Sequence, residues 1–491
     1  MHKLAKTAAL YVIAAVFVAI GLYFVVKKDT YLAFAAPAVV GVLLLYVYSL
    51  DKVLLLVSLI TPLSVNIESL NVSLAISLPS EPMLAGLMVI FFAKLLYERN
   101  FDKKIAYHPI SIVIYLMFIW MIITTITSEI PVVSIKYIVA RLWFIIPAYF
   151  MCAELFKEPK NIGRFIWLYL IGLVIVAIYT IINHAAHGFD GDTAHWVMSP
   201  FYNDHTAYGA ALAVYIVLCA AYLFMPNMKK PVRLAVVVVL CLLIVAIILS
   251  FCRASWISLI AALGVLICVL LRIKFKYIAV IAVVFVGLFF TFQQQIFDSL
   301  SKNDQDASGN IMENIQSMTN ISTDASNLER INRWNSAIKM FEERPVVGWG
   351  PGTYQFVYAP FQESRNKTII STNSGDMGNA HSEYIGALAE MGIPGSLLVV
   401  ALVVAFMYCG LMTYRRAKNK ESKVLVLGAT LALFGYFIHG TLNNFLDTDK
   451  LAVPIWSCMA IITAIDCFHA DKENFYETNG TSELPQDPNQ K

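Results

Sequence analysis

The sequence predicts an all-α membrane protein, a polytopic helical bundle, and three observations lead to this prediction. Hydrophobic residues make up 59% of the 491 residues and charged residues only 14%, against about 25% charged residues in a typical soluble domain. The apolar residues gather into segments of about 20, the length that crosses a bilayer. Lys and Arg gather in alternate short connections between these segments, as they do in cytoplasmic loops.

Fourteen segments are apolar enough to be predicted as spans. In chain order they are 8–26, 31–50, 52–66, 82–97, 109–127, 133–155, 165–183, 207–225, 233–250, 254–271, 277–292, 384–412, 424–440 and 451–468. Segment 52–66 is short and contains Pro62, and both it and 31–50 stay open, so the expected number is 12–14 transmembrane helices. The first segment is too long for a signal peptide and ends in no A-x-A cleavage site, which favours a retained span.

The distribution of positive charge predicts the topology. Five short connections rich in Lys and Arg are expected in the cytoplasm, namely 98–108, 156–164, 226–233, 272–276 and 413–423. The connections 67–81 and 184–206, which contain neither residue, are expected outside. This order places residues 293–383 outside and both termini in the cytoplasm.

Four regions are therefore expected. Residues 1–292 form the N-terminal transmembrane helices, 293–383 a large extracytoplasmic loop, 384–469 the C-terminal transmembrane helices, and 470–491 a polar cytoplasmic tail predicted to be disordered.

The large loop is expected to contain an amphipathic helix. Apolar residues recur at spacings of three and four, which is typical of one helix face; they are Leu328, Ile331, Trp334, Ile338 and Phe341. Ser326 and Glu329 have the spacing of a capping box at the start of this helix. Pro345 is expected to end it.

Several classes of function and cofactor are not supported. The net charge of +3 is too small to indicate a nucleic-acid partner, and no Gly-Lys-Ser/Thr motif indicates a nucleotide. The eight cysteines include no CxxC pair, so neither a disulfide framework nor a cysteine-ligated metal is expected. One external loop is rich in His and Asp, but no third metal ligand stands at a familiar spacing. We therefore expect no metal and no cofactor. The polar loop is expected instead to help to bind sugar hydroxyls.

Four features have residue types suited to chemistry. Arg253 lies between two apolar spans, where an unpaired charge is costly; the alternative is a snorkelling arginine at the interface. Arg330, with Arg333 and Trp334 on the same helix, indicates either an anion site or a solvated face. Gly348-Trp-Gly-Pro-Gly352 indicates an anion-binding turn or a compact turn that closes the helix. His381 stands just before a span, as a proton acceptor or as an interfacial residue.

The order of these motifs resembles the O-antigen ligase/polymerase superfamily. The resemblance rests on Arg330-x-x-x-Trp334, Pro345, Gly348-x-Gly350-x-Gly352, His381-x-x-Tyr384 and Glu390-x-Gly392-x-x-Gly395. Upstream, Ser250-x-x-Arg253 resembles the Ser-Arg segment of the family, although Phe251 and Cys252 separate the two residues here, and Asn203-Asp-His-Thr-Ala207 resembles its Asn-rich segment. The resemblance covers roughly residues 200–470, while the first 200 residues match only in hydropathy.

The resemblance implies an inverting membrane glycosyltransferase of the GT-C kind, in the bacterial inner membrane. Its donor would be a glycan on undecaprenyl diphosphate, and no nucleotide would be needed. Arg253 and Arg330 would hold the diphosphate, and His381 would be the catalytic residue at the acceptor. Residues expected to support this site are Arg333, Trp334, Tyr384, Arg141, Lys136 and His205.

Several functional alternatives stay open. The acceptor would be lipid A-core in a ligase, which we prefer, another lipid-linked repeat in a polymerase, or a protein hydroxyl in an O-oligosaccharyltransferase. A transporter or flippase of the same lipid-linked sugar is the alternative from another class. It would place ionisable groups near the middle of the membrane, whereas the candidate residues here gather at the outer rim. A non-catalytic assembly factor would not require Arg and His in this order.

Overall fold

The computed structural model describes residues 35–66, 76–226, 228–273, 325–364, 371 and 378–476, together with five residues between 11 and 19. The predicted span 277–292, most of the span 8–26 and the tail beyond 476 lie outside the described residues.

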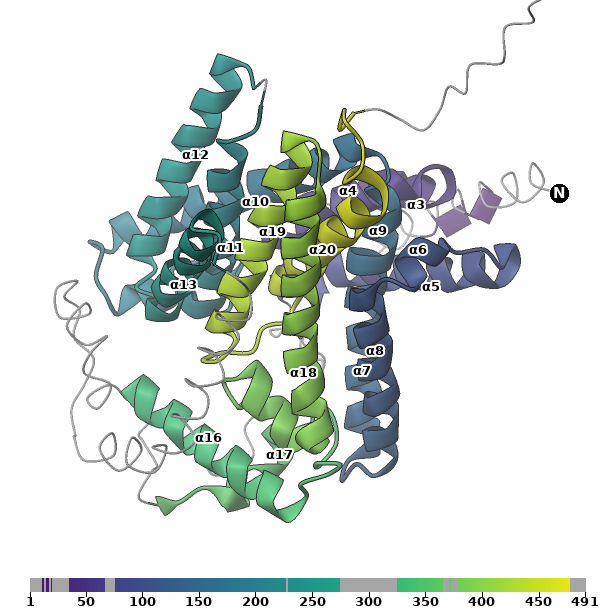
Figure 1. Cartoon of the computed structure of the whole chain (residues 1–491). Coiled ribbons are helices and arrows are strands. Elements are labelled where there is room, and N and C mark those ends of the chain that lie inside the picture. The colour runs from purple at the N-terminus through teal and green to yellow at the C-terminus, as the bar shows by residue number, and fades with distance from the viewer. Residues whose placement is uncertain are drawn as a thin grey trace, which may run out of the picture.

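A bundle of α-helices makes up most of the described chain (Figure 1). Ten of its helices are long and apolar enough to cross a membrane, and they coincide with ten of the predicted spans. They are α5 (Ser80–Glu98), α7 (Pro109–Ile126), α8 to α9 (Pro131–Leu155), α10 (Pro159–Ala186), α11 (His205–Tyr222), α12 (Lys230–Leu249), α13 (Arg253–Leu270), α18 (Glu383–Arg416), α19 (Lys420–His439) and α20 with its π-helical end (Asp449–His469). The predicted all-α polytopic bundle is therefore confirmed.

The two segments that were left undecided as spans, 31–50 and 52–66, fold as shorter elements. Residues of segment 31–50 form α3 (Ala35–Tyr48), and those of segment 52–66 form α4 (Leu50–Ile60) and the 3₁₀ turn Thr61–Leu63 around Pro62. At 11 residues, α4 is about 17 Å long, which is too short to cross the roughly 30 Å of hydrocarbon. Its chain continues into β1 (Val65–Asn66), which pairs antiparallel with β2 (Ser77–Leu78).

The central helices of the bundle are α11, α19 and α20. Their residues are mostly buried, because other helices surround them, whereas α12 and α13 keep broad apolar faces exposed. Small residues allow the close approach of α11 and α13: a Cβ on Gly209 would stand 2.7 Å from Cβ of Cys252. The beginnings of α11 and α13 are thereby held together.

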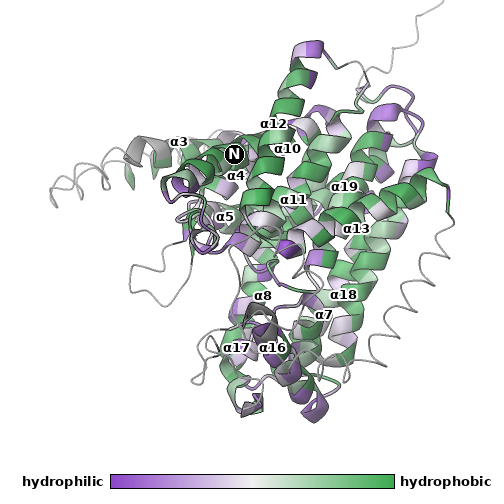
Figure 2. Ribbon diagram, turned by 90° about the vertical axis from the view of Figure 1, so that its left-hand side faces the viewer, coloured by the Kyte–Doolittle hydropathy of each residue, from purple (hydrophilic) through white to green (hydrophobic). Residues whose placement is uncertain are grey.

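The amphipathic helix α16 (Ala325–Glu343) lies apart from the bundle with the short helix α17 (Tyr354–Val357), as Figure 1 shows. Figure 2 shows that α16 is much more hydrophilic than the helices of the bundle. The expected capping box is wrong, because Ser326 lies within the helix rather than before it. The Glu329 carboxylate instead bonds to Nε of Arg333 at 2.6 Å, one helical turn further on.

Helix α18 joins the two parts. Its 34 residues would extend about 50 Å if straight, but Gly392 has φ 66° and ψ −167°, which kinks the helix. The segment before the kink packs against α16. The segment after it, 393–416, is long enough to cross a bilayer. Trp120 of α7 donates to the carbonyl oxygen of Met391 at 2.8 Å and so fixes the kink against the bundle.

Candidate functional site

Four separate segments bring the predicted arginines and histidines together. Arg253 is the first residue of α13 and His205 the first residue of α11, while Arg330 lies in the first half of α16 and His381 just before α18. Arg253 and Arg330 are close enough for their charges to repel each other, and His205 is close to both. All four side chains are half-buried. We call these four residues the cationic cluster.

The turn between α12 and α13 sets the position of Arg253. The chain reverses within three residues, of which Phe251 has φ 49°, and Oγ of Ser250 accepts a hydrogen bond from the amide of Cys252 at 3.3 Å. Helix α13 therefore begins at Arg253, beside the N-terminus of α11. Helix N-termini carry partial positive charge and free amides that favour anions, which adds to the charge of the cluster.

Asp204 is a carboxylate close to the cluster. One of its oxygens caps α11 and accepts from the amides of Thr206 and Ala207 at 2.7 and 2.8 Å. Asp204 also interacts electrostatically with Arg330 and His381. It therefore offsets part of the positive charge of the cluster.

His205 is paired with a second histidine, His195, from the connection that precedes α11. Its Nδ1 lies 3.1 Å from Nδ1 of His195, so one ring donates and the other accepts, and both cannot be protonated at these nitrogens. Burial lowers the pKa of His195, and the charge of Arg253 lowers it further. This rim of the site therefore favours neutral imidazoles.

The connection between α19 and α20, residues 440–448, ties Arg330 to the start of α18. Nε of Arg330 donates to the carbonyl oxygen of Leu442 at 3.2 Å. Two residues earlier, the carbonyl oxygen of Gly440 accepts from the amide of Glu383 at 2.8 Å. The same loop therefore holds both Arg330 and the beginning of α18, directly after His381.

Glu383 fixes this loop with its carboxylate. Its Oε1 accepts from the amides of Phe445 and Leu446, each at 3.0 Å, and from the hydroxyl of Tyr436 at 2.9 Å. Arg141 of α8 supports the same loop, since it donates to the carbonyl oxygen of Leu446 at 3.0 Å and lies 4.0 Å from Glu383. Arg141, predicted to support the phosphate site, is therefore part of the frame that holds Arg330 and His381.

His381 has an unusual backbone and a shifted pKa. Its φ of 48° is rare for a residue with a side chain, and its amide donates to Oδ1 of Asn379 at 3.0 Å. The next residue, Ser382, caps α18 by accepting from the amides of Tyr384 and Ile385. Burial lowers the pKa of His381 from 6.5 to about 3, and the charges of Arg330 and Arg333 contribute to this decrease. The imidazole is therefore neutral at physiological pH.

Other predicted residues have structural contacts. Arg333 bonds to Glu329 and stacks over the ring of Tyr358, with 4.1 Å from Cζ to the ring centroid. The Tyr384 hydroxyl donates to the carbonyl oxygen of Phe437 at 3.1 Å, joining α18 to α19. Lys136 is exposed on α8. Of these three residues, only Arg333 influences His381 electrostatically.

Trp334 is half-buried on α16, and its indole nitrogen has no hydrogen-bond partner among the described residues. A buried indole N–H usually finds an acceptor. Its role at the site stays a prediction.

The glycine-rich turn packs against α18. The amides of Trp349 and Gly350 bond to this helix and are therefore not available to an anion. The amides of Trp349 and Gly350 donate to the carbonyl oxygens of Ala389 and Glu390 at 3.1 and 2.8 Å. Gly348 has φ 67°, and a Cβ there would lie 2.3 Å from the carbonyl carbon of Glu390, so only glycine fits. Of the two readings of this turn, the structure supports the compact one.

The histidine-rich connection between α10 and α11 offers no metal cage among its described residues. Among the residues that the structure describes, no three His, Cys, Asp or Glu side chains are grouped so that they could hold a metal ion. His184 and His187 instead bond to main-chain carbonyl oxygens, those of Asp190 and Asn183, each at 2.8 Å.

Three residues of the site were not singled out from the sequence, namely Asp204, Glu383 and His439. The sequence offers a signal for the first two. Asp204 directly precedes the candidate His205, and Glu383 lies within the motif His381-x-x-Tyr384. His439 ends α19 and is influenced by Arg330 and Asp204, and its sequence context carries no comparable signal.

One known protein family matches part of the chain. The family model described as O-antigen ligase (Wzy_C) matches residues 236–400. This segment is O-antigen ligase-like. The match includes Arg253, Arg330 and His381, and the helices α13, α16 and the first half of α18 that position them. No curated protein matches the chain.

The match over this segment supports a membrane enzyme of the O-antigen ligase or polymerase type. It does not include α11 or α19, which supply His205 and His439. The candidate site is therefore built jointly by the matched segment and by helices on either side of it.

Proposed function

We propose that this protein transfers a glycan from a polyprenyl diphosphate, such as undecaprenyl diphosphate, to an acceptor hydroxyl. The observation that carries the proposal is the approach of Arg253 and Arg330, from different helices, close enough for their charges to repel. Two arginines held this close together cost free energy unless an anion offsets their charge. A diphosphate supplies that charge and suits the forked guanidinium group.

The reaction requires little of the enzyme at the leaving group. The acceptor oxygen forms a bond to the anomeric carbon while the bond from that carbon to the diphosphate oxygen breaks, and the bonding electron pair leaves with the diphosphate. Arg253 and Arg330 stabilise the negative charge that grows on this oxygen. Attack from the face opposite the leaving group inverts the anomeric centre.

His381 removes the proton of the acceptor hydroxyl in this proposal. A base must be unprotonated, and the lowered pKa of His381 keeps it so. A base with a pKa of about 3 is weak, but the bound diphosphate offsets the positive charge of Arg330. Because an anion nearby favours the imidazolium form, donor binding raises the pKa of His381. The base thus becomes stronger when the donor is in place.

The location of the cluster fits a lipid-linked donor. His205, Arg253 and His381 stand at or beside the ends of predicted spans, so the diphosphate would lie at the membrane surface with its polyprenyl tail in the bilayer. By the distribution of Lys and Arg, this surface is the outer face of the bacterial inner membrane. No nucleotide is required, since the diphosphate linkage stores the energy of transfer.

A reconstituted assay tests the proposal and distinguishes the acceptors. Purified protein in vesicles receives an undecaprenyl-diphosphate-linked glycan, either alone or with lipid A-core. We expect glycan on lipid A-core, the product of a ligase, and none with His381→Ala. Longer lipid-linked chains without added acceptor would instead establish a polymerase with the same site. No product on lipid A-core, on lipid-linked glycan or on a protein acceptor would contradict the proposal and favour a flippase, which a flipping assay on the same vesicles would detect.

A further inference from the structure

His439 lies where three parts of the candidate site meet. It is the last residue of α19 and only 1% exposed. Its Nε2 lies 3.8 Å from Sγ of Cys252, the residue before Arg253. Directly after it comes the loop whose carbonyl oxygens bond to Glu383 and Arg330. The ring is also close enough to Arg330 and Asp204 to be influenced by both charges.

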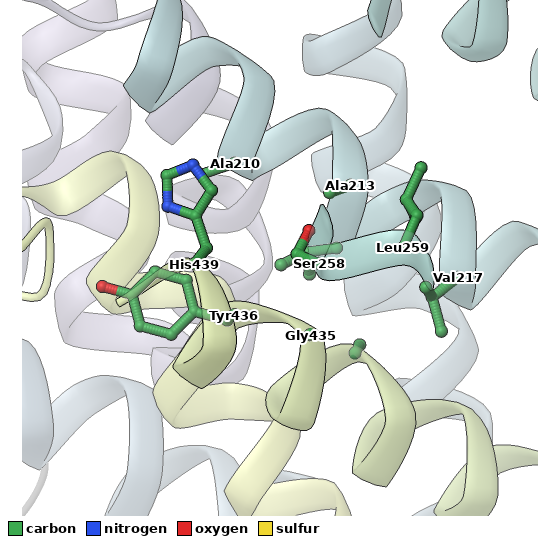
Figure 3. A pocket seen from close by; sticks show the side chains of 10 residues that line it. Ala210, Ala213, Val217, Ser258, Leu259, Gly435, Tyr436 and His439 are labelled. Atoms are coloured by element: carbon green, nitrogen blue, oxygen red, sulfur yellow. The ribbon is translucent and has the colours of Figure 1, made fainter. Parts of the chain in front are cut away.

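The crevice beside His439 has no room for a ligand of its own. It runs between α11, α13 and α19, and small and apolar side chains line most of it, with His439 and Tyr436 at one end (Figure 3). The crevice is too narrow to hold a water molecule. A polar partner for His439 must therefore come from the side of the cationic cluster.

A chain of hydrogen bonds assigns the hydrogen atom on the imidazole. The Ser255 hydroxyl donates to Sγ of Cys252 at 3.0 Å, so the thiol sulfur accepts there and its own hydrogen is available to Nε2 of His439. Nε2 is then the acceptor, and the neutral ring carries its hydrogen on Nδ1.

Nδ1 of His439 is buried and has no hydrogen-bond partner among the described residues. Buried polar groups are nearly always bonded, and an exception calls for a reason such as a missing ion or ligand. The buried N–H lies near the charged guanidinium group of Arg330. An anionic oxygen beside Arg330 would be attracted by that charge and would accept a hydrogen bond from Nδ1.

We propose that His439 is a third donor of the diphosphate site, which gives its Nδ1–H to an anionic oxygen of the lipid-linked donor when that donor binds beside Arg330. This inference rests on the proposed function and adds a binding residue from α19, outside the segment matched by the family. The thiol of Cys252 acts through His439, as the positioning residue that holds the ring in this tautomer. A small displacement of the loop 440–448 would open the path to Nδ1.

The test measures the binding of farnesyl diphosphate to purified full-length protein in detergent, by calorimetry. Loss of a hydrogen bond to a charged group weakens binding by roughly ten- to a hundredfold, and we expect this for His439→Leu. His439→Asn should retain most of the affinity, because the amide nitrogen of Asn replaces Nδ1. His439→Gln, which places its amide near Nε2, should not.

A matched control comes from the other end of the bundle. His469 is likewise fully buried, with Nδ1 lacking a partner in the described chain and Nε2 2.8 Å from the carbonyl oxygen of Phe156. His469→Leu should leave farnesyl diphosphate binding unchanged. If His439→Leu does not fold, the comparison of Asn with Gln at position 439 gives the answer.

The outcomes separate the two proposals. If wild-type protein does not bind farnesyl diphosphate, the proposed function fails. If Arg330→Met abolishes binding while His439→Leu and His439→Gln bind as wild type does, the diphosphate site stands and the role of His439 is overturned. Equal losses for Asn, Gln and Leu would also overturn it, since they would indicate packing alone.

Discussion

Nε of Arg330 on α16 donates to the carbonyl oxygen of Leu442 in the loop between α19 and α20, at 3.2 Å. This bond links the hydrophilic helix outside the bundle to the loop that also holds the amide of Glu383, two residues after His381. A displacement of α16 would therefore move the arginine and change the surroundings of the histidine together. The relationship favours Arg330, rather than Arg333, as the arginine of the proposed reaction site.

Substitution of the two arginines should separate their roles. Arg330→Met should weaken donor binding by roughly ten- to a hundredfold, because it removes a charged donor to the diphosphate, with little change in melting temperature. Arg333→Met should instead destabilise the protein by about 3 kcal/mol, since it breaks a buried ion pair with Glu329. Donor affinity and thermal unfolding in detergent measure the two effects. A silent Arg330→Met beside an Arg333→Met that folds but cannot bind donor would reverse the assignment.

Stability should depend on pH through His381. Its pKa is lowered from 6.5 to about 3 by burial and by Arg330 and Arg333, so the unfolded chain binds a proton at a higher pH than the folded protein does. The stability associated with the neutral imidazole is full above about pH 6.5 and is lost progressively as the pH falls toward 3. Melting temperatures of wild type and His381→Ala between pH 7 and 4 measure this. The decrease should be shallower in the variant; parallel curves would contradict the account.

Glu383 should stabilise the loop 440–448 through the acceptor oxygen that it provides. Glu383→Ala leaves the amides of Phe445 and Leu446 and the hydroxyl of Tyr436 without this acceptor, at a cost of roughly 3 kcal/mol. Glu383→Gln keeps an acceptor oxygen and should lose less. Thermal unfolding and transfer activity should fall together in the Ala variant. Lys136→Ala, exposed on α8, is the control expected to change neither, and a Glu383→Ala protein as stable as wild type would refute the role of this carboxylate.

Accessibility should reveal the orientation in the membrane. Val346, in the turn after α16, is 60% exposed, and the Asp471 side chain, just after α20, is 76% exposed. A cysteine at 346 should react with a membrane-impermeant thiol reagent added outside, whereas one at 471 should react only after the membrane is opened. Both are introduced into a protein in which the exposed Cys241 is replaced by serine. The reverse pattern would invert the proposed topology.

Hydropathy alone predicted the spans well, because a segment that crosses a membrane must be apolar along its whole length. Every long apolar helix in the described chain coincides with a predicted span. The kink at Gly392 was not predicted. It depends on the close approach of the turn at Pro345 and Val346, whose carbonyl oxygens would stand 2.7 and 2.2 Å from a Cβ, and such contacts are not visible in hydropathy.

The candidate site was predicted only in part. The sequence singled out Arg253, Arg330 and His381, which the structure brings together, yet it could not exclude Arg333 as an equal partner of Arg330. One signal was present: Glu329 precedes Arg333 by four residues, the spacing of a helical ion pair. His439 could not be found, because its proximity to Cys252 joins positions 187 residues apart in the chain.

The division of roles between the arginines and His381 is the central claim, and single-turnover transfer in vesicles tests it most directly. Donor binding and the rate of glycan transfer at saturating undecaprenyl-diphosphate-linked glycan are measured for wild type, Arg330→Met and His381→Ala. We predict that His381→Ala binds donor with near wild-type affinity but transfers at least about a hundredfold more slowly, while Arg330→Met loses donor affinity. Normal transfer by His381→Ala, or unchanged donor affinity in Arg330→Met, would contradict the account.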